Sequence, residues 1–195
     1  MYTIVGLGNP GEEYTKTRHN TGRMVLEAVR KANDLPEWEL DKKISALVSR
    51  GKIGKTPIIL AMPETFMNKS GNAVGKLISS VKKAENLIVV HDDLDLGVGT
   101  MKISFNRGSG GHKGLESIIK TIKTQAFTRV RIGISPTTPK GMVKKPIGEK
   151  IVGDFILVPF KKSEDDTMKK VFKKAAESIA SIVSESREMA MNKFN

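Results

Sequence analysis

The chain of 195 residues contains no cysteine. This absence excludes disulfide bonds, thiolate metal sites and a cysteine nucleophile, and it fits a reducing cytosol. Long apolar runs are also missing, since none approaches the about 18 residues needed to cross a bilayer. Residues 1–6 lack the basic and apolar regions of a signal peptide. We therefore expect a cytoplasmic protein that does not bind to a membrane.

Acidic residues are few relative to basic residues. The 33 Lys and Arg side chains exceed the 21 Asp and Glu side chains, so the formal net charge is +12. A surplus of this size favours a polyanionic partner, with nucleic acid as the leading candidate, because Lys and Arg release the counterions that surround phosphates. The lysine pairs at 161–162, 169–170 and 173–174 are equally typical of a solvated surface, so charge alone leaves both interpretations open.

The spacing of apolar residues predicts alternating strands and helices. A length of 195 residues is enough to bury a substantial core and favours one domain over two. We therefore expect a single α/β domain over residues 1–195, with three layers in which helices cover both faces of a mixed, twisted central sheet. The expected elements are strands over 2–7, 87–90, 100–105 and 129–134, a hairpin formed by 46–48 and 57–61, and helices over 21–33, 67–83 and 115–122.

The last third of the chain divides into a loop and a helix. Residues 135–150 are rich in Pro, Gly, Thr and Lys, which predicts a mobile loop. Apolar side chains then recur at helical spacing over about 164–191. This pattern predicts one long amphipathic helix that packs back on the body of the domain.

A glycine motif at 6–11 follows the first predicted strand and matches G-x-G-x-x-G. A dinucleotide site would need free backbone N–H groups at the start of a helix. Pro10 removes one such group, and the helical pattern begins only near Thr21. We therefore reject this site. The chemically useful residue of the segment is Asn9, an amide at the end of a strand, where open α/β sheets form their clefts.

One histidine and one carboxylate stand where a cleft is expected. His19 precedes a predicted helix, and a lone histidine there is more often an exposed or capping residue than a catalyst. Asp92 closes the predicted buried strand over 87–90, so its side chain is expected at the cleft edge. A carboxylate in that place can accept the Nδ1–H of an imidazole and orient it as a general base for water.

Two other patterns allow alternative interpretations. The run His91–Asp95 is compatible with a metal ion, but the chain has no H-E-x-x-H motif and few further acidic ligands, so we expect no metal and no cofactor. The glycine-rich segment 107–114 resembles a phosphate cradle, although a plain strand-to-helix turn explains it as well. Asn68 precedes a predicted helix and can be a capping residue.

Four ordered motifs give the chain a resemblance to a known family. They are VGLGNPGxxYxxTRHNxG at 5–22, TFMNxSG at 65–71, HDDLDL at 91–96 and GGHxGL at 110–115, with further agreement at 129–134 and 152–155. The sequence resembles the bacterial-type peptidyl-tRNA hydrolases. That family cleaves the ester between a peptide, or an N-blocked amino acid, and the 3′ end of tRNA. The resemblance implies a metal-free, monomeric enzyme that recycles tRNA and needs no obligate protein partner.

The resemblance also implies roles for individual residues. His19 would activate water, Asp92 would orient His19, and Asn9 would complete the catalytic set. Residues 135–160 would form a lid-like loop and short helix over the substrate channel. The implied substrate-binding residues are Tyr14, Phe66, Met67, Asn68, His112 and Lys113, and the implied tRNA-binding residues are Lys102 and Arg131.

Two positions depart from the family pattern. Most members carry Asn where this chain has Lys113, and some carry a basic residue where it has Ser104. A lysine near His19 would lower the pKa of the imidazole, unless it points away towards phosphate. We therefore expect reduced or altered activity.

Two alternative functions stay open. Relatives in chloroplasts use the same fold to bind RNA and protein without hydrolysis, and a metal-dependent phosphoesterase is a further alternative.

Overall fold

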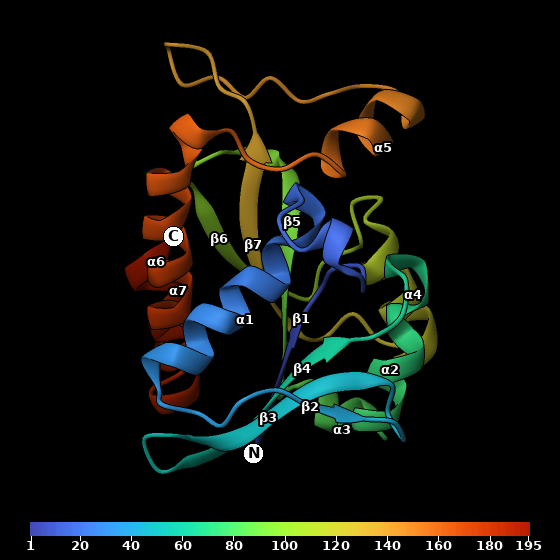
Figure 1. Ribbon diagram of the computed structural model, residues 1–195. Helices are drawn as coiled ribbons and strands as arrows, with labels where there is room; N and C mark the ends of the chain where they lie inside the picture. The colour runs from blue at the N-terminus through green and yellow to red at the C-terminus, as the bar shows by residue number, and fades with distance from the viewer.

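The computed structural model describes residues 1–195 and contains one mixed seven-stranded sheet (Figure 1). The strand order is β2-β3-β4-β1-β5-β7-β6. The four strands β4, β1, β5 and β7 run parallel, whereas β2, β3 and β6 pair antiparallel towards the two edges. The strands are β1 (Tyr2–Gly6), β2 (Glu39–Asp41), β3 (Ala46–Ile53), β4 (Thr56–Pro63), β5 (Leu87–Gly97), β6 (Met101–Phe105) and β7 (Thr128–Ser135).

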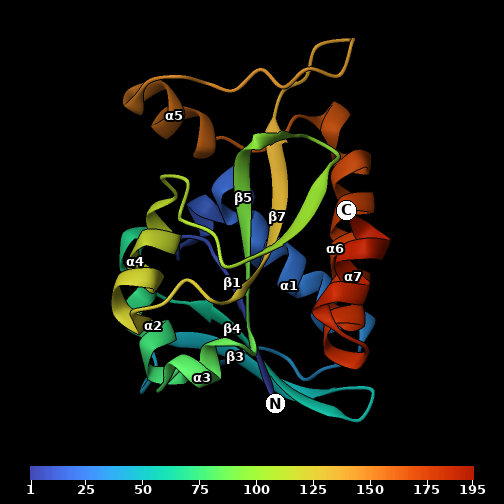
Figure 2. The same ribbon diagram turned by 180° about the vertical axis from the view of Figure 1, so that it is seen from behind.

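Helices cover both faces of this sheet. On one face lie α1, α6 and α7, and on the other lie α2, α3 and α4 (Figures 1 and 2). The three-layer α/β architecture is therefore confirmed. The helices are α1 (Thr21–Ala32), α2 (Ser70–Leu77), α3 (Val81–Ala84), α4 (Lys113–Ile122), α5 (Glu149–Ile156), α6 (Asp165–Ser184) and α7 (Arg187–Phe194), with 3-10 turns η1 (Glu12–Tyr14), η2 (Arg18–Asn20), η3 (Met67–Lys69) and η4 (Lys162–Glu164).

Two apolar cores, one on each face, stabilise the three layers. Because successive strand residues point to opposite faces, Ile4 packs in the core beneath α1 and α6, and Val5 packs in the core beneath α2 and α4. The central strands are buried on both faces, which explains the continuous apolar run at the start of β5. No helix combines the length and the apolar character that a bilayer crossing requires.

Two of the predicted helices are interrupted. The helix expected over 67–83 is a 3-10 turn followed by α2 and, after a break, by α3. The helix expected over 164–191 is α6 followed by α7. At each break a serine in extended conformation caps the next helix, since Ser80 accepts a hydrogen bond from the Lys83 amide and Ser186 accepts one from the Met189 amide. Serine caps helices well and favours their interiors less.

Strand β5 is longer than predicted, and its length places the candidate site. Asp92 does not end the strand, because β7 continues to pair with β5 as far as Gly97. Strand β1 ends earlier, at Gly6, which pairs with Val90. Beyond Val90 one edge of β5 is therefore free for the loop that carries η2. Gly22 at the start of α1 packs directly against β5, since a Cβ atom at Gly22 would lie 2.3 Å from the Val90 carbonyl oxygen.

Between β7 and α6 the chain leaves the body of the domain. Residues 136–148 form no helix or strand apart from an isolated bridge between Thr137 and Val143. They lead to α5, which lies above the carboxyl ends of the parallel strands (Figures 1 and 2).

Candidate active site

A groove of about 1350 Å³ opens beside the carboxyl ends of β5 and β7. Its walls come from β5, β6, β7, the glycine-rich segment before α4, and α5. A pocket for a small molecule usually encloses about 300–1000 Å³, so this groove has room for part of a polymer. The predicted site residues that line it are His19, Asp92, Lys102, His112, Lys113 and Arg131.

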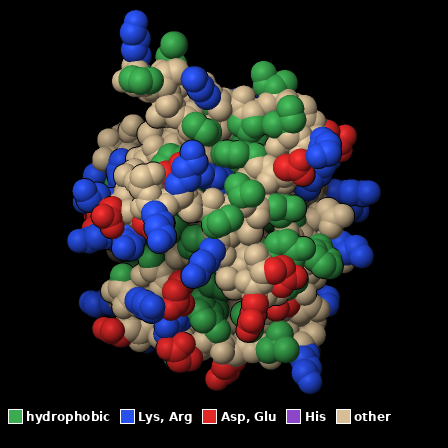
Figure 3. All heavy atoms as spheres, turned by 45° about the horizontal axis from the view of Figure 1, so that its top comes forward, with side chains coloured by type: hydrophobic (Ala, Val, Ile, Leu, Met, Phe, Trp, Pro, Cys, Tyr) green, Lys and Arg blue, Asp and Glu red, His purple; other side chains and the backbone are tan.

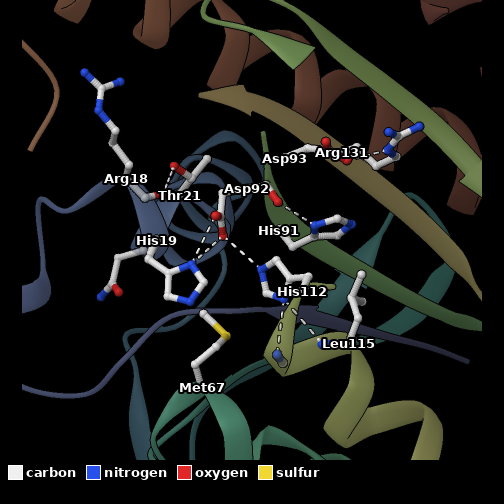
Figure 4. Close-up of polar contacts among 12 residues, drawn as sticks. Arg18, His19, Thr21, Met67, His91, Asp92, Asp93, His112, Leu115 and Arg131 are labelled. Carbon is white, nitrogen blue, oxygen red and sulfur yellow. Dashed lines mark hydrogen bonds and ion pairs between the residues drawn. The ribbon is translucent and has the colours of Figure 1, made fainter. Parts of the chain in front are cut away.

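The carboxylate of Asp92 lies between two imidazoles at one side of the groove (Figure 4). The Nδ1 atom of His19 lies 3.0 Å from each carboxylate oxygen, and the Nε2 atom of His112 lies 3.0 Å from Oδ1. Asp92 is 3% exposed and His19 is 7% exposed. The predicted pair of His19 and Asp92 is thus formed, with His112 as a second partner of the carboxylate.

The protonation of His112 follows from its hydrogen bonds. Its Nδ1 atom accepts hydrogen bonds from the backbone amides of Gly114 and Leu115, at 3.2 and 3.4 Å, and so caps α4. The ring proton is therefore on Nε2, from which it is donated to Asp92. Both nitrogens are occupied within the protein, so these contacts favour a positioning role, and the substrate-binding role expected of His112 stays a prediction. Within the glycine-rich segment the cap occupies the Gly114 amide, and the amides of Gly111 and His112 donate to Ser109, which favours the plain-turn interpretation.

Electrostatics around Asp92 keep the carboxylate ionised. Burial raises the pKa of Asp92, but the adjacent His19 and His112 rings outweigh burial and hold that pKa well below its usual range. Burial lowers the pKa of His19, and the charge and hydrogen bond of Asp92 more than offset this, so the pKa is raised above 6.5. When His19 is neutral, Nδ1–H is donated to Asp92 and Nε2 carries a free lone pair.

Asn9 is held with its amide donors unoccupied. Its Oδ1 atom accepts a hydrogen bond from the Met67 amide at 2.9 Å. The side chain of Asn20 accepts from the backbone N–H of Asn9 and donates to its carbonyl oxygen, each at 2.9 Å. Asn9 is thus a rigid donor of the kind that stabilises an oxyanion. The supporting role of Asn20 was missed in the sequence, where its place directly after His19 was the available signal.

Four predicted substrate residues lie outside the groove lining, namely Tyr14, Phe66, Met67 and Asn68. Met67 is 5% exposed and lies next to His19 in Figure 4. It packs so tightly on Gly114 that a Cβ there would lie 2.5 Å from the Met67 sulfur. Phe66 and Asn68 on either side of Met67 are exposed, and Tyr14 is half-buried in η1.

Basic side chains line the groove along β6 and β7. Lys102 and Arg131 are register partners on these neighbouring strands. The Nε atom of Arg131 donates to Asp93 at 2.7 Å, which leaves the end of the guanidinium available (Figure 4). Two further arginines in the lining, Arg107 and Arg129, were not predicted. The signal was the alternation of arginines at 129 and 131 in one strand, which places both on one face.

Lys113 points away from the histidines. Its side chain is 67% exposed, and its Nζ atom lies 3.8 Å from a carboxylate oxygen of Glu116 on the same helix. The pKa of His19 is raised by Asp92, and Lys113 is not among the causes of the shift. Of the two orientations considered for Lys113, the structure therefore has the one directed away from the base.

Comparisons with known proteins agree on one family. The family described as "Peptidyl-tRNA hydrolase" matches residues 3–195. A relative with that name from Aquifex aeolicus is 42% identical over 98% of this chain and 95% of its own, and one from Alkaliphilus oremlandii is 35% identical over the full length of both. The crystal structure of peptidyl-tRNA hydrolase from Acinetobacter baumannii superposes with a TM-score of 0.88 at 30% identity, over 100% of this chain and 94% of that one.

Proposed function

Because the chain belongs to the peptidyl-tRNA hydrolase family, we propose that it hydrolyses the ester between a peptide, or an N-blocked amino acid, and tRNA with water activated by His19. The observation that carries this proposal is the contact of His19 with Asp92. It fixes Nδ1 of the buried imidazole on a carboxylate and leaves Nε2 as the basic atom. Neutral imidazole with this orientation is a general base near neutral pH.

The proposed reaction needs no covalent enzyme intermediate. Nε2 of His19 takes a proton from water while the water oxygen attacks the ester carbonyl carbon. The carbonyl oxygen becomes an oxyanion, towards which the free amide N–H groups of Asn9 can donate. The imidazolium, stabilised by Asp92, then gives its proton to the ribose oxygen as the ester bond breaks. The products are the peptide carboxylic acid and tRNA with a free hydroxyl group.

We further propose that the reaction is metal-free. Ligand atoms of His19, Asp92 and His112 lie within 4.8 Å of one another, which makes this the one group that could hold a metal ion. The Nε2 atom of His112 could bind a metal only if its proton moved to Nδ1. That shift would remove both hydrogen bonds that cap α4. The tautomer required by the cap therefore opposes a metal here.

The RNA part of the substrate is proposed to lie along the basic wall of β6 and β7. Lys102 and Arg131 can contact consecutive phosphates, because their strands pair in register. Residues 135–160, which include α5, are proposed to act as a lid over the groove. In keeping with the family resemblance, we propose a monomer that acts in the cytoplasm without an obligate protein partner.

The experiment that tests the function follows release of N-acetyl amino acid from an N-acetyl-aminoacyl-tRNA in the presence of a chelator. Wild type is expected to cleave, and His19→Asn is expected to lose at least about 100-fold in kcat, as is typical when a general base is removed. Val81→Ala is the control, because Val81 is 55% exposed on α3 and lies outside the groove lining. Binding of tRNA without hydrolysis, or activity that requires added metal, would contradict the proposal.

A further inference from the structure

Two neighbouring residues of η2 point in opposite directions. His19 points to Asp92, whereas the side chain of Arg18 points away from the histidine cluster (Figure 4). Arg18 is 2% exposed, which is rare for an arginine without a specific set of partners. The partners of this guanidinium connect η2 to the lid.

The guanidinium of Arg18 contacts the lid and the chain on both sides of it. One nitrogen donates to the carbonyl oxygen of Ile134 in β7, at 3.1 Å, and another donates to Glu164 in η4, at 2.7 Å. Between these contacts the group lies over two aromatic rings, 4.8 Å from the centroid of Phe155 in α5 and 4.6 Å from that of Phe160. A planar, weakly hydrated cation is suited to such a dry, stacked position.

The backbone of η2 is attached to the same part of the lid. The amide of Arg18 donates to the carbonyl oxygen of Val158 at 3.0 Å. Thr17 forms an isolated bridge with Pro159. The residue before the base and the residues after α5 are therefore joined by main-chain and side-chain contacts.

Few other contacts hold α5. None of its residues is buried, and the element that it contacts most is η2. Apolar side chains are exposed on the upper part of the molecule where the lid lies (Figure 3), including Ile147, Ile151 and Leu157. On its inner side α5 turns Val152 and Ile156 to the groove that also contains His19. The contacts of α5 with the body of the domain are thus concentrated at η2, which carries Arg18.

We propose that Arg18 is a positioning residue that couples the lid to the base, so that seating of α5 over the substrate and placement of His19 are one event. This inference rests on the proposed function of His19 and the lid. Arg18 and His19 are adjacent in the 3-10 turn η2, so a shift of the Arg18 backbone would also move His19. A misplacement of about 1 Å at a reacting group can reduce the rate about 100-fold.

The test compares Arg18→Lys, Phe155→Leu and the double variant, with Val81→Ala as a control in α3, where the side chain is 55% exposed and far from the lid in the chain. Arg18→Lys keeps the charge and loses the planar group. With N-acetyl-aminoacyl-tRNA we expect about a tenfold fall in kcat for Arg18→Lys and a smaller fall for Phe155→Leu. The double variant should be no worse than Arg18→Lys, since both changes break one connection. Val81→Ala should match wild type.

Hydrogen exchange of the free protein supplies a readout that does not depend on activity. Amides of residues 149–156 should exchange faster in Arg18→Lys and Phe155→Leu, while amides of β1 and β5 keep their protection. Wild-type kcat in Arg18→Lys, or a fall in kcat with unchanged exchange in α5, would overturn the coupling. If Arg18→Lys does not fold, Phe155→Leu decides by the same two readouts. Failure of wild type to hydrolyse the ester would overturn the proposed function, and the exchange data would still show whether Arg18 holds α5.

Discussion

The Nε2 atom of His112 lies 3.0 Å from Oδ1 of Asp92, and this contact gives the carboxylate a second fixed donor opposite His19. A carboxylate held by donors on both sides has little freedom to rotate. The orientation of His19 therefore depends on a residue that precedes α4.

His112→Asn separates the two functions of this histidine. Asparagine is also a good helix cap, so α4 keeps its N-terminal cap, but the shorter side chain does not reach Asp92. We expect kcat to fall about tenfold with little change in KM, because the lost contact positions the base and does not bind substrate. Steady-state kinetics on N-acetyl-aminoacyl-tRNA provide the measurement. A raised KM at wild-type kcat would instead support the predicted contact between His112 and the substrate.

The pH dependence of hydrolysis should report the raised pKa of His19. The base acts only when neutral, so kcat/KM is expected to rise with pH through a midpoint above 6.5. Asp92→Asn removes the negative charge that raises this pKa, so the midpoint should move to lower pH while the plateau falls about 100-fold. The profile and an NMR titration of the His19 ring check both statements. An unchanged midpoint in Asp92→Asn would show that Asp92 does not set the pKa.

Lys113→Asn tests the departure from the family pattern. The ammonium is exposed and pairs only with Glu116, so the variant should leave the pH midpoint of His19 unchanged. Lys113 lines the groove, and we expect a severalfold change in KM when an amide that can accept hydrogen bonds replaces a charged donor. The measurement is steady-state kinetics on the same substrate at low and at high salt. Kinetics identical to wild type would leave Lys113 without a role.

The fold was predictable where the apolar pattern is long and regular. Strand β1 and helix α1 lie close to their predicted ranges, and the hairpin is present, although β3 runs to Ile53 where the prediction ended at residue 48. The breaks at Ser80 and Ser186 were not predicted, because the apolar spacing continues through each break and a single capping serine is a weak signal. Local propensity thus predicts the existence of elements better than their ends.

The site was predictable in its residue types and only partly in its contacts. Sequence reasoning paired His19 with Asp92 because a carboxylate expected at the cleft edge, at the end of a buried strand, can orient a nearby imidazole. It did not predict that Asn20 holds Asn9 or that both nitrogens of His112 are occupied, because these contacts depend on where loops return to the sheet. Such long-range geometry has no periodic signature in the chain.

Salt dependence should identify the basic wall as the RNA contact. Lys102→Gln and Arg131→Gln each remove one charge from paired positions of β6 and β7. Each variant is expected to raise KM severalfold and to reduce the slope of log affinity against log salt by about one, since each phosphate contact releases about one counterion. Lys55→Gln is the control, because Lys55 is an exposed residue of the hairpin turn outside the groove lining. Arg131 is partly neutralised by Asp93, so its effect should be the smaller of the two. Equal slopes for wild type and both variants would show that the RNA binds to another face of the molecule.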